Sequence, residues 1–420
     1  MICSDLILSI QNGEYDERLV SLYGKTSLTK EKERVCRAIR EFSKLYGDVD
    51  ARVFSTTGRS EISGNHTDHN HGCVLAASVD LDIIAVACKT DDNIIRVKSE
   101  GFDEDVCPLG SGDFKKYSSA AIIYGVCDGF EKSGAKIGGF RAYTTSSVLK
   151  GSGLSSSAAF EDMTGFILSE LYNEGKVDNV KIAKISQYAE NEFFGKPCGL
   201  MDQVACAVGG FVFIDFGKEE PLITPIKFDL AGAGYDLCIV NTGGNHADLN
   251  EDYASVPSEM KAVAACFGKE TLRGIKREEL LSESAQLRQK LGDRPLLRAF
   301  HFINENERVV KQRDALMNGD FGTFLSLVKE SGDSSFRFLQ NVYTNKNPNE
   351  QGLSLAICIS ENILGDNGVC RVHGGGFAGT VQAFVKRGFT DEYKTQIEKV
   401  FGKGSCSVLS VRAEGTAVII

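Results

Sequence analysis

The sequence lacks the excess of basic residues that a nucleic-acid-binding surface requires. Its 47 Lys and Arg are outnumbered by 57 Asp and Glu, which gives a net charge of -10. This balance argues against a large basic surface, so an anionic ligand must be held by local groups. No uninterrupted apolar run approaches the roughly 20 residues of a membrane helix. We therefore expect no nucleic-acid partner and no membrane partner.

Paired cysteines of the C-x-x-C type are also missing. The 13 cysteines are scattered from Cys3 to Cys406, and their odd number and spacing disfavour a disulfide framework or a zinc site. The first segment, "MICSDLILSI", has no basic residues before its apolar ones, and Asp5 interrupts them, unlike a secretory signal. These features predict reduced thiols and a cytoplasmic protein.

What the sequence does contain is an α+β pattern in two domains. A chain of 420 residues is too long for one ordinary core. We place a boundary near Gly217, where a charged turn follows a strand, which gives domains of 1–217 and 218–420. Apolar periodicity predicts helices in "TKEKERVCRAIREFSKLYG" (capped by Thr29), "KGSGLSSSAAFEDMTGFILSELYNEG" and "NVKIAKISQYAENEFFGKP". Strands are predicted in "NIIRVKS", "GGFRAYTTSSVL", "GGFVFIDFG" and "YDLCIVNT".

The segment "TTGRSEISGNHTDHNHG", residues 56–72, holds many polar side chains between glycines. We expect it to form a loop after a short strand around residues 52–55. Its histidines lack the helical spacing of H-E-x-x-H, and the nearest cysteine is Cys73, so a structural zinc is disfavoured. The residues alone leave open whether the segment binds a small molecule or is an ordinary surface loop.

A glycine-serine turn, "KGSGLSSSAAF" at residues 150–160, precedes a predicted helix. Unpaired N–H groups at a helix start favour an anion, and serine hydroxyls can add donors to phosphate or ligands to Mg²⁺. The segment is neither a Walker A motif nor a G-x-G-x-x-G fingerprint. A serine that merely caps the helix is the alternative.

Three further segments carry candidate groups. The consecutive glycines of "VHGGGFAGT", residues 372–380, indicate close approach by a ligand or by a second backbone. Asp202 lies in the apolar segment "CGLMDQVACAVGG" and must be paired, either as a catalytic base or as a helix cap. Glu190, in "YAENEFFG", suits a metal ligand or a solvated helix edge.

Together, and in this order, the segments resemble the signatures of the galactokinase family, which belongs to the GHMP small-molecule kinases. The family's first signature reads approximately GRVNLIGEHTDYNDG and is "GRSEISGNHTDHNHG" here. The second, P-x-G-x-G-L-S-S-S-A, appears as "LKGSGLSSSA", and the third, GGGFGG, as "GGGFAG". The resemblance runs from about Lys30 to the end. It implies the α+β two-domain GHMP kinase fold, with a ribosomal-protein-S5-like amino-terminal domain and a ferredoxin-like carboxy-terminal domain.

The resemblance also implies roles for individual residues. Asp202 matches the aspartate that accepts the proton of the sugar's anomeric hydroxyl, and Arg59 matches the arginine that keeps it ionised. The positions that match sugar contacts are Asn65, His66, Asp68, Gly199 and Tyr253. The positions that match the nucleotide loop are Gly151, Ser152, Gly153, Leu154, Ser155, Ser156 and Ser157. The positions that match Mg²⁺ ligands are Glu190 and Ser157, with Ser156 as the alternative serine.

The implied activity is ATP-dependent phosphorylation of galactose at its anomeric hydroxyl, with Mg²⁺ as cofactor, ATP and a galactose-type sugar as ligands, and a monomer or weak oligomer as the assembly. Several residues depart from the signature. Asn65 replaces a Glu and Glu61 an Asn, while His69, His71 and Leu149 replace Tyr, Asp and Pro. Because Asn65 would not repel a carboxylate at C6, galacturonate is an alternative substrate, as is N-acetylgalactosamine. A non-catalytic sensor of galactose and ATP is an alternative of another class.

Overall fold

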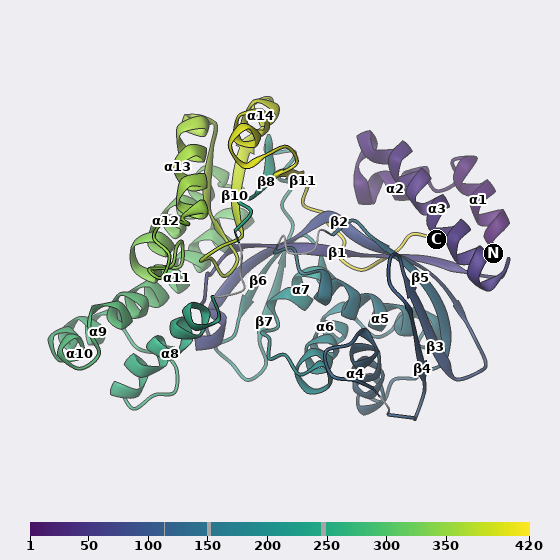
Figure 1. Cartoon of the computed structure of the whole chain (residues 1–420), viewed down its shortest axis with the longest axis horizontal. Helices are drawn as coiled ribbons and strands as arrows, with labels where there is room; N and C mark the ends of the chain where they lie inside the picture. Colours follow the sequence, from purple (N-terminus) through teal and green to yellow (C-terminus); the bar gives the residue numbers. More distant parts are fainter. Residues whose placement is uncertain (113, 149–152, 245–248) are drawn as a thin grey trace.

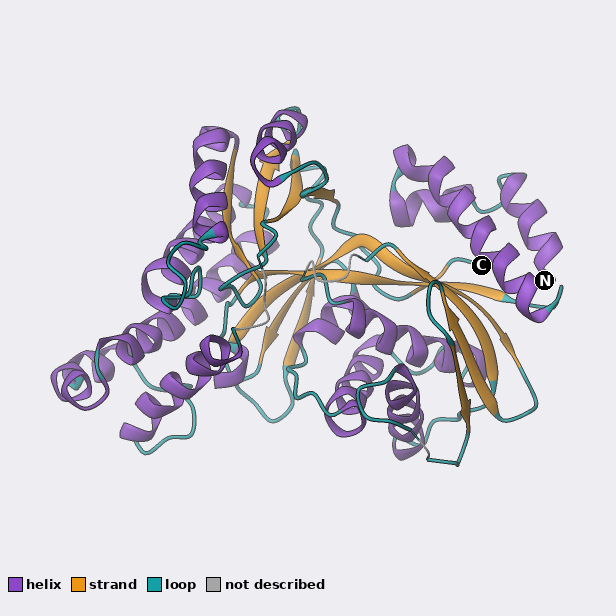
Figure 2. Ribbon diagram, viewed as in Figure 1, coloured by secondary structure: helices purple, strands orange, loops and turns teal. Residues whose placement is uncertain are grey.

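The structure is a computed structural model that describes residues 1–112, 114–148, 153–244 and 249–420. These residues form a large mixed sheet and a smaller antiparallel sheet, each covered by helices (Figures 1 and 2). This arrangement confirms the expected α+β class. Among the described helices, none combines the length and the hydropathy that crossing a bilayer requires.

The larger sheet is organised around one long central strand. Its main path runs β12-β1-β2-β5-β3-β4, and β6 pairs with both β2 and β7. The first part of β2 pairs with β6 and its second part pairs with β5, while β3 and β5 are parallel. The strands are β1 (Arg52–Ser63), β2 (Cys73–Lys89), β3 (Ile94–Ser99), β4 (Glu104–Pro108), β5 (Phe140–Ser146), β6 (Phe211–Asp215), β7 (Leu222–Ile226) and β12 (Ala417–Val418).

Helices cover both faces of the larger sheet, as Figure 1 shows. One face carries α4 (Ser119–Lys132), α5 (Ser156–Tyr172), α6 (Asn179–Tyr188), the π-helical turn η3 (Ala189–Phe194) and α7 (Met201–Val208). The other face packs against α1 (Cys3–Gln11), α2 (Asp16–Tyr23), the short turn η1 (Lys25–Ser27) and α3 (Leu28–Tyr46).

The smaller sheet has the order β11-β8-β10-β9. Its strands are β8 (Tyr235–Asn241), β9 (Gly368–His373), β10 (Thr380–Lys386) and β11 (Cys406–Leu409). The helical elements of this half are α8 (Asn250–Cys266), α9 (Arg277–Ser282), α10 (Ser284–Leu291), α11 (Asp293–Met317), α12 (Phe321–Ser334), η4 (Ser335–Leu339), α13 (Gly352–Leu364), η5 (Gly365–Asn367) and α14 (Thr390–Phe401). The division at residue 217 stays a prediction, since β7 extends the larger sheet beyond it and β12 returns to that sheet.

Most of the predicted elements are confirmed, with two corrections. The helix predicted from Thr29 begins at Leu28 with Ser27 as its N-cap, so Thr29 lies inside it. The polar segment expected to be a loop is a strand as far as Ser63, followed by the short turn η2 (Asp68–Asn70). The reason is that β1 pairs along its length with β2 and is buried at every position after Arg52, so each polar side chain finds a protein partner.

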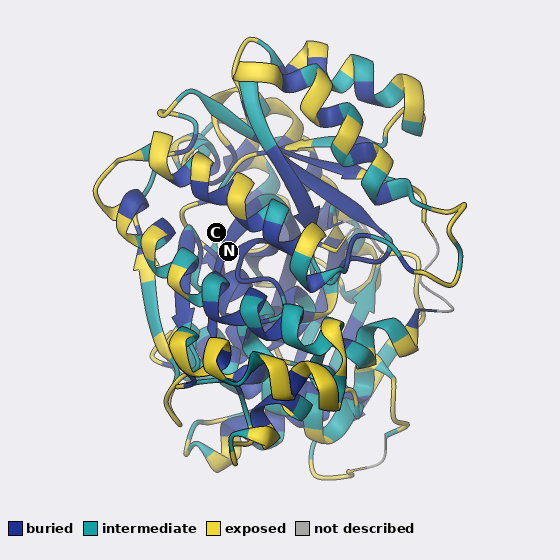
Figure 3. Cartoon of the chain, turned by 90° about the vertical axis from the view of Figure 1, so that its left-hand side faces the viewer, coloured by how far each residue is buried: buried dark blue, intermediate teal, exposed yellow. Residues whose placement is uncertain are grey.

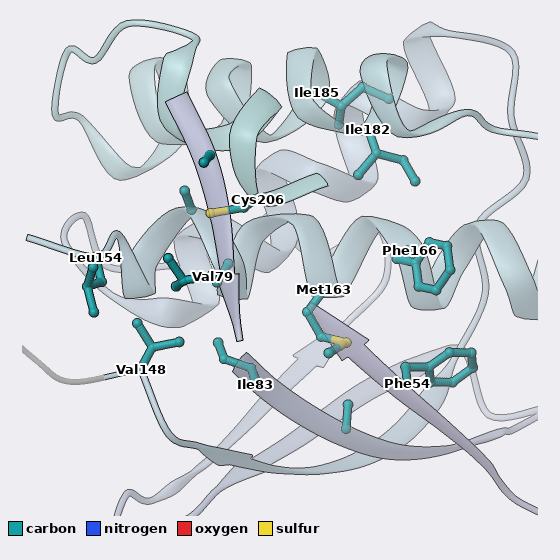
Figure 4. Close-up of a cluster of buried hydrophobic side chains, with 14 of the residues drawn as sticks. Phe54, Val79, Ile83, Val148, Leu154, Met163, Phe166, Ile182, Ile185 and Cys206 are labelled. Carbon is teal, nitrogen blue, oxygen red and sulfur yellow. The ribbon is translucent and has the colours of Figure 1, made fainter. Parts of the chain in front are cut away.

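The core fixes the two ends of the segment that precedes α5. Figure 4 shows Met163 and Phe166 of α5 packed toward Phe54 of β1, with Val148 and Leu154 at one side of the same cluster. Each large side chain buried in this way contributes about 1.5–3 kcal/mol. Val148 lies before the glycine-serine turn and Leu154 lies within it, and both side chains are buried. The chain is therefore anchored in the core on either side of residues 149–152. Figure 3 shows the strands buried between helices whose outer faces are exposed.

A buried charged cluster ties α2, α3 and the carboxy-terminal segment to β2. The carboxyl of Asp82, which is fully buried, accepts hydrogen bonds from Arg34 Nη1 at 2.5 Å and Tyr23 Oη at 2.6 Å. Arg412 Nη1 lies 3.3 Å from the same carboxyl. The backbone N–H of Asp82 in turn bonds Ser147 Oγ at 2.9 Å, next to the anchor at Val148.

We predict that Asp82→Asn lowers the free energy of unfolding by about 3–5 kcal/mol, because two buried guanidinium groups lose their counter-charge. Urea denaturation of the purified protein measures this. Glu174→Gln is the control: Glu174 pairs with Lys176 at the surface, and such pairs contribute about 0–1 kcal/mol. Equal effects of the two substitutions would contradict the importance of the buried cluster.

Candidate active site

An ion pair between Arg59 and Asp202 forms the centre of the site. Arg59 projects from β1 and Asp202 from the first turn of α7, and Arg59 Nε lies 2.8 Å from Asp202 Oδ1. The second carboxyl oxygen accepts a hydrogen bond from Ser155 Oγ at 2.5 Å. Leu200, not Asp202, is the N-cap of α7, and no side chain caps this helix. The helix-cap interpretation of Asp202 is therefore wrong.

The surroundings of Asp202 keep its carboxyl ionised. Burial acts to raise the pKa of Asp202, but the Arg59 guanidinium, together with the Ser155 hydroxyl and Lys196, holds that pKa below its ordinary value. The side chain nevertheless keeps 34% of its surface exposed. An ionised carboxylate that a ligand can reach is a suitable general base.

The glycine-serine turn is held against the same guanidinium. The side-chain Nη1 of Arg59 donates to the main-chain oxygen of Gly153, and the main-chain N–H of Arg59 donates to the main-chain oxygen of Leu154 at 3.1 Å. Ser155 adopts a left-handed backbone conformation just before α5 (φ 57°), which turns its hydroxyl toward Asp202. Ser156 and Ser157 begin α5. Gly151 and Ser152, also predicted for the nucleotide loop, lie outside the described residues.

Asp68 and Gly199 meet beside Asp202, as expected for neighbours in one site. A Cβ at Gly199 would lie 2.8 Å from Asp68 Oδ2, so glycine permits this approach. Burial raises the pKa of Asp68; the His66 imidazole opposes this shift and the Asp202 carboxyl adds to it. Asp68 and Asp202 are therefore neighbouring carboxyl groups whose pKa values are shifted in opposite directions.

The three consecutive glycines make room for protein groups. His66 Nε2 is 2.8 Å from Gly375 O, and the Tyr253 hydroxyl donates to Gly376 O at 2.7 Å. A Cβ at Gly375 would lie 2.8 Å from Tyr253 Cε1, and one at Gly376 would overlap the main-chain oxygen of Asn341. The groups that approach this glycine run closely are thus the Tyr253 side chain and the Asn341 backbone.

Asn65 is fully buried and hydrogen-bonded within the protein. Its Nδ2 donates to Glu61 Oε1 at 2.8 Å and to Gly374 O at 2.7 Å. Its Oδ1 accepts from Asn341 Nδ2 at 2.6 Å. The role of Asn65 as a direct sugar contact stays a prediction.

Two buried carboxyl groups lie near the start of α5. Gln203 Nε2 donates to Glu161 Oε2 and to Glu190 Oε2, each at 3.0 Å, and Lys196 Nζ lies 3.0 Å from Glu190 Oε1. Glu161 Oε1 has no hydrogen-bond partner among the described residues. Burial and the neighbouring Glu190 raise the pKa of Glu161 to about 8. Glu190 is buried, which contradicts the solvated-edge interpretation.

Both carboxyl groups line a cavity of about 450 Å³. Ser156 and Ser157 line the same cavity. The remaining wall is largely apolar and comes from β2, α4, α5 and neighbouring segments; its large apolar residues are Ile83, Phe102, Ile122, Val148, Phe160 and Phe194. The cavity thus combines side chains that carry oxygen ligands with a largely apolar lining.

Sequence reasoning missed several residues of the site. Glu161 directly follows the glycine-serine turn and Gln203 directly follows Asp202, yet only their partners in the folded chain indicate their roles. His373 is another: its Nε2 lies 3.1 Å from Ser60 Oγ and its Nδ1 2.8 Å from Thr380 Oγ1. Burial, with Arg59 nearby, lowers the pKa of His373 to about 3. A neutral imidazole therefore joins β1 to the smaller sheet.

The fold and this charged site define a small-molecule kinase of the GHMP class. Residues 121–210 match the GHMP kinases N terminal domain, and residues 40–89 match the galactokinase galactose-binding signature. The galactokinase of Clostridium tetani is 30% identical over 373 residues, 87% of this chain and 91% of the relative. That of Thermotoga petrophila is 31% identical over 349 residues, 82% of this chain and 93% of the relative. The chain belongs to the galactokinase family.

Solved structures confirm the GHMP kinase fold. The Lactococcus lactis galactokinase, in complex with galactose, superposes with a TM-score of 0.76 at 22% identity, covering 90% of this chain and 98% of that chain. The L. major mevalonate kinase, in complex with R-mevalonate, gives a TM-score of 0.58 at 14% identity, covering 87% and 96%.

We predict that Gly376→Ala lowers the free energy of unfolding by at least about 3 kcal/mol, since its Cβ would collide with backbone at a position of φ 82°. Gly374→Ala is the matched control, because φ is 68° there but the Cβ would meet open space. Only the left-handed backbone penalty of about 1–2 kcal/mol applies to it. Chemical denaturation measures both, and a control as damaging as Gly376→Ala would show that crowding is unimportant.

Proposed function

We propose that the protein transfers the terminal phosphoryl group of ATP to the anomeric hydroxyl of galactose, giving galactose 1-phosphate. The observation that carries this proposal is the ion pair of Arg59 with Asp202, placed between the sugar-signature residues and the start of α5. A phosphoryl acceptor needs a base on one side and neutralised negative charge on the other. In this proposal Asp202 is the base, and Arg59 neutralises negative charge.

In the proposed reaction Asp202 accepts the proton of the anomeric hydroxyl. Arg59 keeps Asp202 ionised before the transfer and balances charge on the moving phosphoryl group. The Arg59 contact with Gly153 O fixes this guanidinium relative to the turn. Asp68, Gly199, His66 and Tyr253 are the proposed sugar-binding groups, since polyhydroxy ligands require several positioned donors and acceptors.

The cavity beside α5 is the proposed ATP site. Its apolar lining suits a purine ring, and Ser156 and Ser157, which also line it, begin α5, where backbone N–H groups and the helix dipole favour phosphate. Ser156 and Ser157 add hydroxyl donors there. Ser155 has a second proposed role, because its hydroxyl also orients Asp202.

Mg²⁺ is the proposed cofactor, and the residues present fit it. Glu190 and Ser157, with Ser156 as the alternative, supply the oxygen ligands that this cation prefers. The buried Glu161 oxygen without a partner indicates that a positive charge is missing beside the two carboxyl groups. When bound, the cation neutralises phosphate charge during transfer.

Other substrates and a sensory role are less well supported. Galacturonate and N-acetylgalactosamine are not favoured by the relatives, which are galactokinases. A sensor without activity would not require Asp202 to be ionised beside Arg59 at the phosphate turn. We further propose that the enzyme is cytoplasmic, is a monomer or weak oligomer, and has no nucleic-acid or membrane partner. The net charge of -10 agrees with the expected lack of a nucleic-acid partner.

The deciding experiment is coupled detection of ADP release over galactose, galacturonate, galactosamine, N-acetylgalactosamine and glucose. We expect galactose to give the highest kcat/KM. Asp202→Asn should lower kcat by about 10²–10⁴-fold, the usual contribution of a general base, while calorimetry still detects galactose binding. Asp128→Asn is the control, because Asp128 of α4 pairs with Lys132 and Tyr188 and does not contact Asp202. An unchanged kcat for the Asp202 variant would remove the assigned base.

We predict that the apparent affinity for Mg²⁺ rises between pH 6.5 and pH 8, because Glu161, whose pKa is about 8, must release its proton beside the cation. The half-saturating free Mg²⁺ concentration at fixed ATP measures this. Glu161→Gln should remove most of the pH dependence. If the variant retains the full wild-type dependence, Glu161 is not the titrating group.

A further inference from the structure

The side chain of Lys196 turns back to the carboxyl of Glu190, one of the proposed Mg²⁺ ligands. Its Nζ lies 3.0 Å from Glu190 Oε1. The main chain makes the same return, because the N–H groups of Gly195 and Lys196 donate to the main-chain oxygen of Glu190 at 3.0 and 3.2 Å. Gly195 permits this tight return after η3 with a φ of 89°. Lys196 is therefore tethered beside the carboxyl by its own backbone.

Both oxygens of the Glu190 carboxyl are occupied. Oε2 accepts a hydrogen bond from Gln203 Nε2 at 3.0 Å, and Oε1 accepts one from the ammonium of Lys196. The Gln203 side chain is fully buried and also donates to Glu161 Oε2 at 3.0 Å, so two partners fix it. A metal ion that binds Glu190 would therefore bind at Oε1, where the ammonium lies.

Lys196 is free to leave this position, whereas Glu190 is not. The side chain of Lys196 is 60% exposed, and that of Glu190 only 4%. A lysine carries its charge on a flexible stem, so its ammonium can move into water without a change of the backbone. A divalent cation and an ammonium at one poorly solvated oxygen would repel each other strongly. Binding of the cation would thus displace the ammonium and leave Glu190 in place.

The ammonium supplies only part of the positive charge that the neighbouring carboxyl groups require. Burial acts to lower the pKa of Lys196, but the Glu190 carboxylate raises it above its ordinary value. Lys196 also opposes the rise in the pKa of Glu161 that burial and Glu190 cause. Glu161 Oε1 nevertheless has no hydrogen-bond partner within the described part of the chain. One ammonium is therefore an incomplete substitute for a divalent cation.

We propose that Lys196 is a displaceable counter-ion: its ammonium occupies the metal position at Glu190 in the metal-free protein and leaves when Mg²⁺ binds there. This inference rests on the proposed function, in which Glu190 is a metal ligand. Lys196 then stabilises the metal-free protein and lowers the affinity for Mg²⁺, because it competes for the same oxygen. A lysine that only anchored its loop would have the first effect without the second.

The test measures the melting temperature against MgCl₂ concentration, without nucleotide, for the wild type and for Lys196→Met. Methionine keeps much of the side-chain length but not the charge. In EDTA the variant should melt about 1–3 °C lower, because the buried carboxyl of Glu190 loses its partner. Mg²⁺ should restore this loss, with a half-maximal concentration about two- to fivefold lower than for the wild type, which is the range that a half-exposed ion pair supports.

Two further variants are controls. Lys196→Arg keeps the positive charge and should resemble the wild type in both measurements. Lys132→Met removes a comparable ion pair elsewhere: Lys132 Nζ lies 2.8 Å from Asp128, and its side chain is 64% exposed. Because Asp128 is not a proposed metal ligand, this variant should leave the half-maximal Mg²⁺ concentration unchanged.

The outcomes separate this inference from the proposed function. If the wild type phosphorylates no sugar with Mg²⁺ and ATP, the proposed function fails. If it is active but Lys196→Met leaves the half-maximal Mg²⁺ concentration unchanged or raises it, the displacement is overturned and the kinase assignment stands. The absence of any Mg²⁺ effect on either melting temperature overturns it as well. A lower concentration in Lys196→Met, with wild-type values in both controls, supports it.

Discussion

The contact between Arg59 and Asp202 is the interaction on which the rest of the site depends. A partly buried carboxyl such as that of Asp202 tends to become neutral, because burial disfavours its charged form. The adjacent guanidinium reverses that tendency, at the cost of removing two charges from water. The same guanidinium bonds Gly153 O, so strand, helix and glycine-serine turn are oriented by one group. The contact that positions Asp202, the proposed base, therefore also positions the turn that is proposed to hold the phosphates.

The first strand of the larger sheet explains how the two halves share this site. One side of β1 meets α7 through Thr57 and Arg59. Toward the carboxy-terminal half, Ser60 reaches His373, and Ser63 bonds Glu305 of α11. A strand buried between two halves would ordinarily be apolar. Here its polar residues are matched by polar groups from α7 on one side and from the second half on the other, which rigidifies the junction only if all partners are present.

This matching also explains what the sequence could and could not predict. Helices such as α3 and α5, and strands such as β3 and β6, follow from apolar periodicity, because each buries one face whatever its partner. The extent of β1 was missed, since its polar residues look like a loop until Glu305 and His373 are known. The signature matches located Asp202 and Arg59 correctly as neighbours. They could not show that Ser155 faces Asp202, because that depends on a left-handed residue before α5.

The distribution of charge within the site explains why a polyanionic co-substrate would need a cation. Asp202 and Asp68 lie beside the proposed sugar position, and Glu161 and Glu190 lie near the start of α5. Arg59 and Lys196 balance only part of this charge, and Glu161 is left with an elevated pKa and an unpaired oxygen. A buried carboxyl in that condition costs free energy unless a proton or cation joins it. A divalent cation would complete the proposed phosphate-binding site, so the cation and the nucleotide would stabilise one another's binding there.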